Sequence, residues 1–486
     1  MPKHKKFYVT TPIYYVNDSP HVGSAYTTVI ADIIARWHRL KNEDVFFLTG
    51  LDENSQKTVQ ASIKLGFSDI QKYADYMAEK WKETFKKLNI SNNDFIRTTE
   101  ERHKILVTEV IEKIKKKGDI YKGNYSGLYC DDCEEFKTLE DLTPDGLCPY
   151  HKKPPKEIQE QNYFFRLSEY QDEVLKLLQK KGFADPDSRK NEMINFVKKG
   201  LRDISISRQN TKWGIPFPGD ESQFLYVWSE ALLNYLHPKD YWPADVLLIG
   251  KDIQKFHMII FPAMLMSAGY KLPKKVFAHG FFTVNGQKMS KSLGNAIDPI
   301  HLANKYSVDA LRYYYAREIP FGQDGDFSEE SLKNRLNNEL ANELGNLISR
   351  TLTLIEKNLN SEVKKDKTDK KLFFYFKFKQ IDKFMQNLEI HNAIAGIFGF
   401  IQDCNKYIND NKPWEVKDKN KLNYILYNLA DAIRIIAMLI QPFIPETSEK
   451  INKQLNLELE TFDKCKAGLL EYTKITKGEI LFKKIE

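Results

Sequence analysis

Four residues with metal-binding side chains stand close together in the segment CDDCEEFKTLEDLTPDGLCPYH. Two residues separate Cys130 from Cys133, two separate Cys148 from His151, and fourteen lie between the two pairs. Thiolate and imidazole groups at these spacings are typical of tetrahedral zinc sites. Because four protein ligands leave no open position for a substrate, we expect one structural zinc ion here. Free thiols and a disulfide are the alternatives.

The segment SPHVGSAY has residues that suit phosphate binding. It places His21 and Gly23 between a predicted strand and a predicted helix. The N–H groups at a helix N-terminus attract anions, Gly23 lets a nucleotide approach the backbone, and His21 can hydrogen-bond to phosphate oxygens. Taken alone, the segment is better explained by a histidine that supports a tight turn before a helix.

The segment GQKMSKSLGN carries two lysines, Lys288 and Lys291, between serines and between Gly286 and Gly294. A solvated surface loop has the same composition. The lysines therefore indicate a function only in combination with residues elsewhere in the chain.

The segments around these residues alternate between strand and helix. FYVTTPIYY begins as a strand, residues 22–40 have the apolar periodicity of a helix, and residues 44–50 form an apolar run typical of a strand buried on both faces. The same order returns in residues 245–284. Two αβ halves of a parallel sheet therefore flank a middle region that contains the cysteines.

The last third of the chain, from about residue 330, has a helical pattern. It is clearest where apolar residues recur at steps of four and three, namely Leu422, Leu426, Leu429, Ile433, Ile436 and Ile440. We expect a helix bundle, in which the lysine-rich segment SEVKKDKTDKK is a solvated connection between helices.

Composition limits the class of protein. A chain of 486 residues with 42% hydrophobic residues predicts two to four folded domains, and the net charge of +7 favours an acidic or nucleic-acid partner without requiring one. Five cysteines, three of them clustered, suit a reducing compartment. We find no signal peptide and no stretch that approaches a membrane span, so we expect a cytoplasmic protein.

The segments HVGS and KMSKS occur in the order of the two signature motifs of class I aminoacyl-tRNA synthetases. The strings YVTTPIYYVND, LTGLDENSQK, FLYVWSEALLNYL, IGKDIQKFH and KPW resemble the bacterial methionyl-tRNA synthetases, and the similarity runs along essentially the whole chain. The resemblance implies an α/β fold with a Rossmann-type class I synthetase catalytic domain. A zinc-bearing insertion splits this domain, and an all-α anticodon-binding bundle follows it.

The resemblance also implies domain boundaries. The catalytic domain would have its first half in residues 1–115 and its second half in residues 225–284, with the connective insertion and its zinc knuckle in residues 116–224. Residues 285–343 would form a stem-contact region with the KMSKS loop, and residues 344–486 the helical anticodon-binding domain.

The implied reaction has two steps. The carboxylate of L-methionine attacks the α-phosphate of ATP, which enters with Mg²⁺, and diphosphate leaves. The 3′ end of tRNA(Met), including the initiator, then accepts the methionyl group, and AMP leaves. No protein nucleophile is needed, so catalysis would come from alignment and charge stabilisation. We expect a monomer.

Site residues follow from the resemblance by position. The residues implied for ATP are His21, Gly23, Ser24, Gly250, Lys251, Asp252, Lys288 and Lys291. Among these, His21, Lys288 and Lys291 would be catalytic, because they can meet negative charge that develops on the phosphates. The residues implied for methionine are Pro12, Ile13, Tyr15, Asp52, Trp228, Ala231, Tyr235, Ile253 and His257. The residues implied for the anticodon are Asn346, Arg350 and Trp414.

The implied roles are chemically sensible. Asp52 is a suitable counter-ion for an ammonium group, and an aromatic pocket suits a polarizable thioether. An exposed indole such as Trp414 can stack on an unpaired base, while Arg and Asn side chains can hydrogen-bond to its edge. Without the resemblance, these residues would be assigned to packing and capping.

Four positions depart from the family pattern. Ser24 replaces the last histidine of the HIGH-type motif, Asn54 and Ser55 replace the histidine and glycine of a frequent DEHG, and Phe261 stands where a tryptophan is common. The replacements at 24, 54 and 55 keep hydrogen-bonding side chains. We therefore expect retained activity with altered ATP contacts, and a changed pocket wall at Phe261.

Three other functions fit part of the sequence. Another class I synthetase, above all the cysteine enzyme, could share both signature motifs and the zinc. A nucleotidyltransferase could use a similar histidine-glycine phosphate site, but it would not explain an anticodon-like helical third. A catalytically silent tRNA-binding paralogue is the third alternative, and Ser24 and Asn54 are the residues that favour it.

Overall fold

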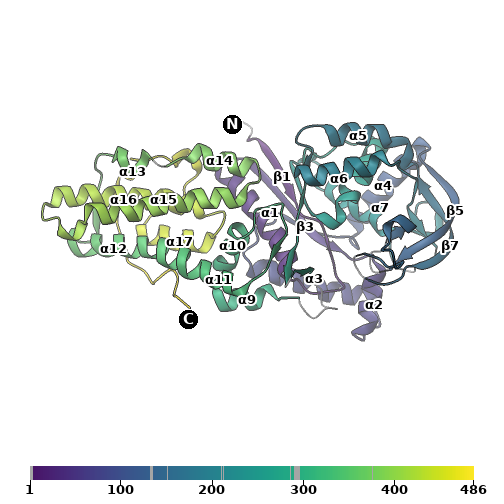
Figure 1. Ribbon diagram of the computed structural model, residues 1–486, viewed down its shortest axis with the longest axis horizontal. Coiled ribbons are helices and arrows are strands. Elements are labelled where there is room, and N and C mark those ends of the chain that lie inside the picture. The colour runs from purple at the N-terminus through teal and green to yellow at the C-terminus, as the bar shows by residue number, and fades with distance from the viewer. Residues whose placement is uncertain are drawn as a thin grey trace.

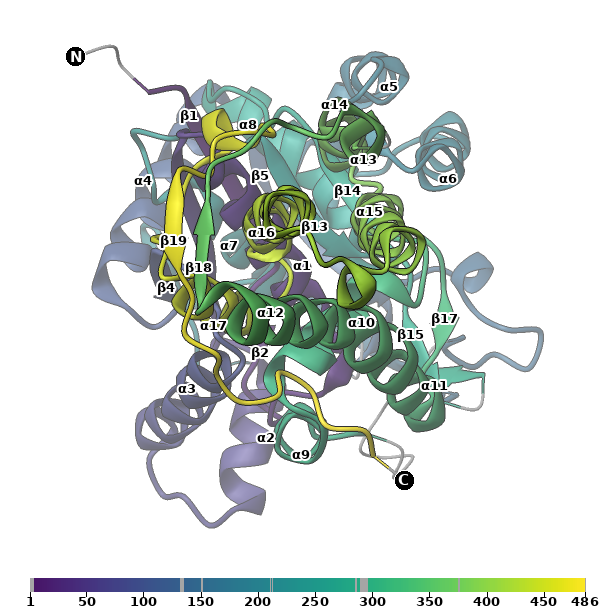
Figure 2. The ribbon, with the colours of Figure 1, turned by 90° about the vertical axis from the view of Figure 1, so that its left-hand side faces the viewer.

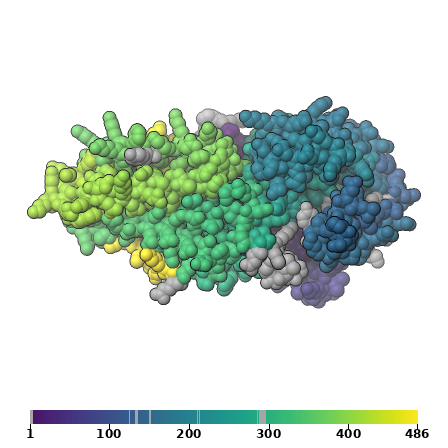
Figure 3. Space-filling view, viewed as in Figure 1, coloured from purple at the N-terminus to yellow at the C-terminus, as the bar shows by residue number. Residues whose placement is uncertain are grey.

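The computed structural model describes residues 4–131, 135–149, 152–209, 211, 213–284, 286–288, 296–374 and 376–485. The molecule is elongated (Figure 1). A helical part forms one end and an αβ part lies in the middle. Strands β5 (Ile120–Cys130) and β7 (Lys156–Phe165) lie at the other end. The space-filling view shows the same outline (Figure 3).

A parallel sheet forms the middle of the molecule. Its seven strands have the order β2-β3-β1-β13-β14-β8, with β4 also paired to β3, and every pairing is parallel. The strands are β1 (Lys6–Thr10), β2 (Tyr14–Tyr15), β3 (Asp44–Asp52), β4 (Asp94–Arg97), β8 (Ala184–Asp185), β13 (Val246–Gly250) and β14 (Val276–His279). The two predicted αβ halves are confirmed, and they share one sheet.

The order of the strands reverses at β1. This strand pairs with β3 of the first half on one side and with β13 of the second half on the other. The connections that leave β1 and β13 therefore diverge, which opens a crevice at the carboxyl ends of these two strands. Open αβ sheets bind their ligands at such a point.

Both faces of the sheet are covered. Along β13, Val246 and Leu248 belong to one hydrophobic core, whereas Leu247 and Ile249 belong to another. The helix α1 (Val22–Leu40) packs in the first core, and α4 (Glu101–Lys117) and α8 (Phe261–Ala268) pack in the second. The predicted helix at 22–40 and the predicted strand at 44–50 are confirmed, since strands buried on both faces are apolar throughout.

The other elements of the first half and the insertion surround this sheet. The helices are α2 (Gln56–Lys64), α3 (Ile70–Lys87), η1 (Leu139–Asp141), η2 (Leu167–Tyr170), α5 (Gln171–Gln179) and α6 (Asp187–Lys198). The strands are β5 (Ile120–Cys130), β6 (Glu135–Lys137), β7 (Lys156–Phe165), β9 (Ile204–Ser205), β10 (Ser207–Arg208), β11 (Pro216–Phe217) and β12 (Asp220–Leu225). They form a sheet of order β6-β5-β7-β9 and another of order β10-β12-β11.

The second half continues through short helices to a third small sheet. These elements are α7 (Val227–Ala231), η3 (Leu232–Leu236), η4 (Lys251–Ile253), the π-helix η5 (Phe256–Ile260), β15 (Phe282–Val284), β16 (Gln287–Lys288), α9 (Pro299–Tyr306), α10 (Val308–Arg317), β17 (Gly325–Asp326) and α11 (Glu329–Arg335). Strands β16, β15 and β17 pair in that order. The predicted apolar segment at 275–284 is thus divided between two sheets at Gly280.

The last third is a helix bundle, as predicted. Its elements are the π-helix η7 (Leu336–Gly345), α12 (Asn346–Leu359), α13 (Lys370–Phe374), α14 (Phe378–Gln386), α15 (Ile390–Asn411), η8 (Pro413–Glu415), α16 (Lys419–Ile440), α17 (Pro445–Leu455) and η9 (Phe462–Lys464), with strands β18 (Glu362–Lys364) and β19 (Tyr472–Lys474). Viewed along the long axis, α16 lies in the centre (Figure 2). All six apolar residues that predicted it are buried.

Two expectations need correction in this region. We expected no stretch that approaches a membrane span, but the helix α16 is long and apolar enough to cross a membrane. In the structure, 89% of its most apolar 18 residues are buried inside the protein, as in a core helix. The lysine-rich segment is also not entirely a solvated connection. Its first residues form β18, which pairs with β19, because Val363 is fully buried while the lysines around it stay outside.

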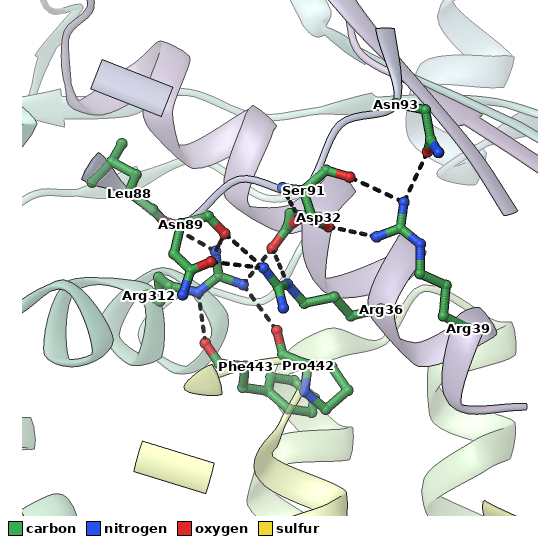
Figure 4. A network of polar contacts seen from close by, with 10 residues as sticks. All are labelled: Asp32, Arg36, Arg39, Leu88, Asn89, Ser91, Asn93, Arg312, Pro442 and Phe443. Atoms are coloured by element: carbon green, nitrogen blue, oxygen red, sulfur yellow. Dashed lines mark hydrogen bonds and ion pairs between the residues drawn. The ribbon is translucent and has the colours of Figure 1, made fainter. Parts of the chain in front are cut away.

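A buried ion pair joins the bundle to α1 (Figure 4). The guanidinium of Arg312, on α10, donates to Asp32 Oδ2 of α1 at 2.7 Å. It also donates to the carbonyls of Phe443 and Pro442, just after α16, at 2.9 Å each. The guanidinium also donates to a third backbone carbonyl, that of Leu88, at 3.2 Å. Both charged side chains are completely buried.

Candidate functional site

A cavity of about 390 Å³ lies at the crevice between the two halves of the sheet. Its walls come from the segment after β1, the N-terminus of α1, the end of β3, the α7–η3 region and the ends of β13 and β14. These segments are far apart in the sequence. Since they meet where the strand order reverses, the cavity is the default candidate for the functional site.

All nine residues that the resemblance implied for methionine line this cavity. Tyr15 and Asp52 stand opposite each other in the β2–β3 pairing, and both line the cavity. The carboxylate is nearly buried, with 4% of the residue exposed. It is therefore placed to face a cationic group of a ligand rather than bulk water.

One wall of the cavity is aromatic and uncharged. The rings of Trp228 and Phe256 stack with centroids 3.9 Å apart. His257 Nδ1 lies 2.9 Å from the carbonyl of Ile253, and Tyr235 Oη lies 2.7 Å from His257 Nε2. Burial lowers the pKa of His257 to about 4. The imidazole is therefore neutral: Nδ1–H donates to Ile253, and Nε2 accepts from the Tyr235 hydroxyl.

The phosphate-side residues His21, Gly23 and Ser24 form the N-terminus of α1. His21 Nδ1 accepts from the backbone N–H of Gly23 at 3.1 Å. The ring can fold back this far because residue 23 is glycine, since a Cβ there would lie 2.9 Å from His21 Cε1. With Nδ1 as an acceptor, the ring proton sits on Nε2, which leaves Nε2–H as the donor of the neutral ring.

Ser24 has a structural task that the sequence did not reveal. Its hydroxyl accepts from the backbone N–H of His21 at 3.0 Å and donates to the His21 carbonyl at 2.9 Å. Together with the Gly23 contact, this completes a reciprocal cap at the start of α1. Asn54 is also engaged, since its amide donates to Glu230 and to the carbonyl of Thr98 at 3.1 Å each.

Three buried polar atoms of the cavity wall have no hydrogen-bond partner within the part of the chain that the structure describes. They are Tyr26 Oη, Trp228 Nε1 and Asn234 Oδ1. An unsatisfied buried polar atom is costly. Such atoms in a cavity wall therefore indicate that a ligand or water completes them.

The second half supplies the remaining phosphate-side residues only in part. Gly250 and Asp252 line the cavity, whereas Lys251 does not and pairs instead with Asp324 at 2.5 Å. The backbone of Lys288 pairs with Thr283 of β15, next to Phe282 in the cavity wall. The Lys288 side chain and the whole of Lys291 lie outside the described residues.

The cavity also contains residues that the sequence did not suggest. Thr27 Oγ1 lies 2.8 Å from His279 Nε2, and His279 Nδ1 lies 2.7 Å from the carbonyl of Gly280. Burial lowers the pKa of His279, so Nδ1–H donates to Gly280 and Nε2 accepts from Thr27. Lys57 is a further lining residue. Thr27 lies near the start of the helix that follows a predicted central strand, so its position in the sequence could have indicated a site residue. No local pattern indicated His279 or Lys57.

Two of the four predicted zinc ligands are described. Cys130 ends β5, and the backbone of Cys148 bonds to Lys153, shortly before Lys156 pairs with Tyr129. Both cysteines therefore lie at the same end of the β5–β7 ladder, and both side chains are buried. Cys133 and His151 lie outside the described residues.

The three predicted anticodon residues gather on one side of the bundle. The guanidinium of Arg350 lies 5.7 Å from the ring centroid of Trp414, whose side chain is 52% exposed. Arg350 also donates to Asn409 Oδ1 at 3.0 Å. Asn346 is exposed one helical turn before Arg350, on the same face of α12.

Comparison with known families gives two matches. The family described as "tRNA synthetases class I (M)" matches residues 7–158 and 151–352. The family described as "Anticodon-binding domain of tRNA ligase" matches residues 375–483. The matches cover the αβ part with its insertion and most of the helical bundle.

Similar proteins agree with these families. The methionine–tRNA ligase of Thermotoga maritima is 46% identical, over 99% of this chain and 80% of that protein. The corresponding ligase of Caldanaerobacter subterraneus subsp. tengcongensis is 45% identical, over 99% of this chain and 79% of its own.

A solved structure agrees as well. The Mycobacterium tuberculosis methionyl-tRNA synthetase in complex with methionyl-adenylate has a TM-score of 0.94 and 38% identity, and the alignment covers 98% of this chain and 99% of that one. The cavity, the parallel sheet, the helical bundle and these matches together show that the chain belongs to the methionyl-tRNA synthetase family of class I aminoacyl-tRNA synthetases.

Proposed function

We infer that this chain is a methionine–tRNA ligase, which activates L-methionine with ATP and transfers the methionyl group to tRNA(Met). The observation that carries this inference is the single cavity at the crevice of the sheet. All nine residues implied for methionine line this cavity, together with His21, Gly23 and Ser24 at the N-terminus of α1. Residues implied for both reactants of the first step therefore line one cavity between the two halves.

The neutral aromatic wall would select the thioether side chain. Trp228, Tyr235 and His257 offer polarizable rings and no net charge, which suits a soft sulfur atom. Asp52 would bind the ammonium group. The amino acid would then be held with its carboxylate directed toward the phosphate side of the cavity. With both reactants bound, the attack on the α-phosphate becomes an effectively unimolecular step.

The phosphates would lie over the N-terminus of α1. His21 would donate from Nε2 to a phosphate oxygen, because its Nδ1 is already used as the helix cap. Lys288 and Lys291 would add positive charge from the opposite side, since the β15–β16 pairing brings this segment to the cavity wall. The Mg²⁺ that accompanies ATP would neutralise further phosphate charge.

The exposed side of the helical bundle would read the anticodon. Trp414 offers a face on which a base can stack, and Arg350 and Asn346 offer donors beside it. This surface would fix the tRNA at one end of the molecule while its 3′ end enters the cavity.

A zinc ion would hold the end of the β5–β7 ladder together. The buried side chains of Cys130 and Cys148 lie close together at this end and suit a thiolate site, and Cys133 and His151 would complete four ligands. We expect about one zinc per chain by elemental analysis and a lower unfolding temperature after chelation. Cys148→Ala should lose the metal, whereas Cys404→Ala, a buried thiol in the bundle, should keep it. Full zinc content in the Cys148→Ala protein would contradict the assignment.

The proposed function is tested by ATP–pyrophosphate exchange with each amino acid in turn. We expect exchange with L-methionine, and weaker exchange with close analogues, because an apolar pocket discriminates only about 10- to 200-fold per methylene. A reaction without amino acid is the control. Exchange that depends on cysteine, or that stays at background with the zinc-loaded protein, would exclude the assignment and favour another synthetase or a silent paralogue.

A further inference from the structure

Lys57 lines the cavity and has no part in the mechanism described so far. It is the second residue of α2, and its Nζ lies 4.4 Å from the ring centroid of Tyr15. Among the lining residues that the structure describes, it is the one lysine or arginine. The ion pairs of the described residues do not include it, so its charge is available to a ligand.

The position of Lys57 is not explained by helix stability. The first turn of a helix carries partial positive charge, and a cation there is unfavourable. The stable cap of α2 comes from Ser55, which accepts from the N–H of Thr58. A residue that departs from local preference and faces a cavity is expected at a functional site.

The charge next to Lys57 has the opposite sign. Tyr15, whose ring lies under the ammonium group, stands opposite Asp52 in the β2–β3 pairing. Asp52 is therefore the sheet neighbour of the residue over whose ring Lys57 lies, and all three residues line the methionine end of the cavity. An amino acid carries an ammonium and a carboxylate group on the same carbon, so it needs two opposite charges side by side.

We propose that Lys57 binds the α-carboxylate of methionine while Asp52 binds its ammonium group. This inference rests on the proposed function and adds a specific contact to it. With one carboxylate oxygen bound to Lys57, the other is directed to the α-phosphate. It forms the new C(O)O–P bond there as the bond between the α-phosphorus and the bridging oxygen breaks, and diphosphate leaves with the electron pair.

The test compares two ligands in two variants. L-Methioninol has the thioether and the ammonium group of methionine but no carboxylate. By calorimetric titration, Lys57→Gln should weaken methionine binding by about 10- to 100-fold, as expected for the loss of a charge-assisted hydrogen bond. It should leave methioninol binding within about 2-fold. Lys57→Arg, which keeps the charge, should restore much of the methionine affinity.

Controls separate this contact from other roles. Lys64→Gln removes an exposed lysine from the end of the same helix and should behave as the wild type. Equal weakening of methionine and methioninol would overturn the proposal, because Lys57 would then only support the Tyr15 ring. Unchanged methionine affinity with a raised KM for ATP would also overturn it and assign Lys57 to a phosphate. Absence of methionine binding to the wild type would overturn the proposed function itself.

Discussion

Replacing His21 by alanine is expected to lower the kcat of methionine-dependent pyrophosphate exchange by about 10²- to 10³-fold, the usual cost of one donor to a developing negative charge. The reason is the fixed tautomer. Nδ1 accepts from Gly23, so Nε2–H is held as a donor without reorganisation when the phosphate charge grows. The binding of methionine, which we propose to involve other walls of the cavity, should change little.

The matched variant for this prediction is His21→Asn. Asparagine is among the best N-cap residues, so it should keep the start of α1, whereas alanine should cost about 1 kcal/mol of stability. Its short amide would not reach the phosphates as we propose for the imidazole. Both variants should therefore lose activity, and only the alanine variant should melt earlier. Near wild-type kcat in His21→Asn would show that the histidine serves only as a cap.

Replacing Arg312 by methionine is expected to lower the apparent free energy of unfolding by about 3–5 kcal/mol, the usual cost of removing one partner of a buried ion pair. Burial alone raises the pKa of Asp32, but Arg312, Arg36 and Ser91 outweigh it and hold that pKa below its ordinary value. The variant would leave Asp32 without its principal counter-charge. It would also deprive the carbonyls of Pro442 and Phe443 of their donor.

Urea unfolding followed by circular dichroism measures this effect. Arg335→Met is the control. Arg335, on α11, also forms ion pairs, with two glutamates, but its side chain is 28% exposed. Ion pairs that water reaches contribute about 0–1 kcal/mol, so the control should lose far less stability. Equal losses in the two variants would contradict the role of the buried pair. Arg312 connects α1 to the segment just after α16 (Figure 4). Its loss should therefore also weaken the packing of the helical bundle against the αβ part.

Local patterns in the sequence determined much of the fold. The apolar period of α1, the continuous run of β3 and the four-and-three spacing in α16 predicted elements that the structure confirms. These patterns are reliable because each element must bury a face, and the period of its apolar residues follows from its own geometry. The signature segments, read through the family resemblance, placed nine residues that all line one cavity.

Only the tertiary structure decided what lies next to what. The sequence does not show that β1 separates β3 from β13, that Ser24 caps α1, or that Val363 draws a lysine-rich segment into β18. It gave no sign that Lys57 lies over Tyr15 or that Arg312 reaches Asp32. These contacts join residues distant in the chain, and their energy comes from burial and the pairing of charges away from water. These free energies depend on the packing of the whole molecule, so they cannot be predicted from the periodicity of a local segment.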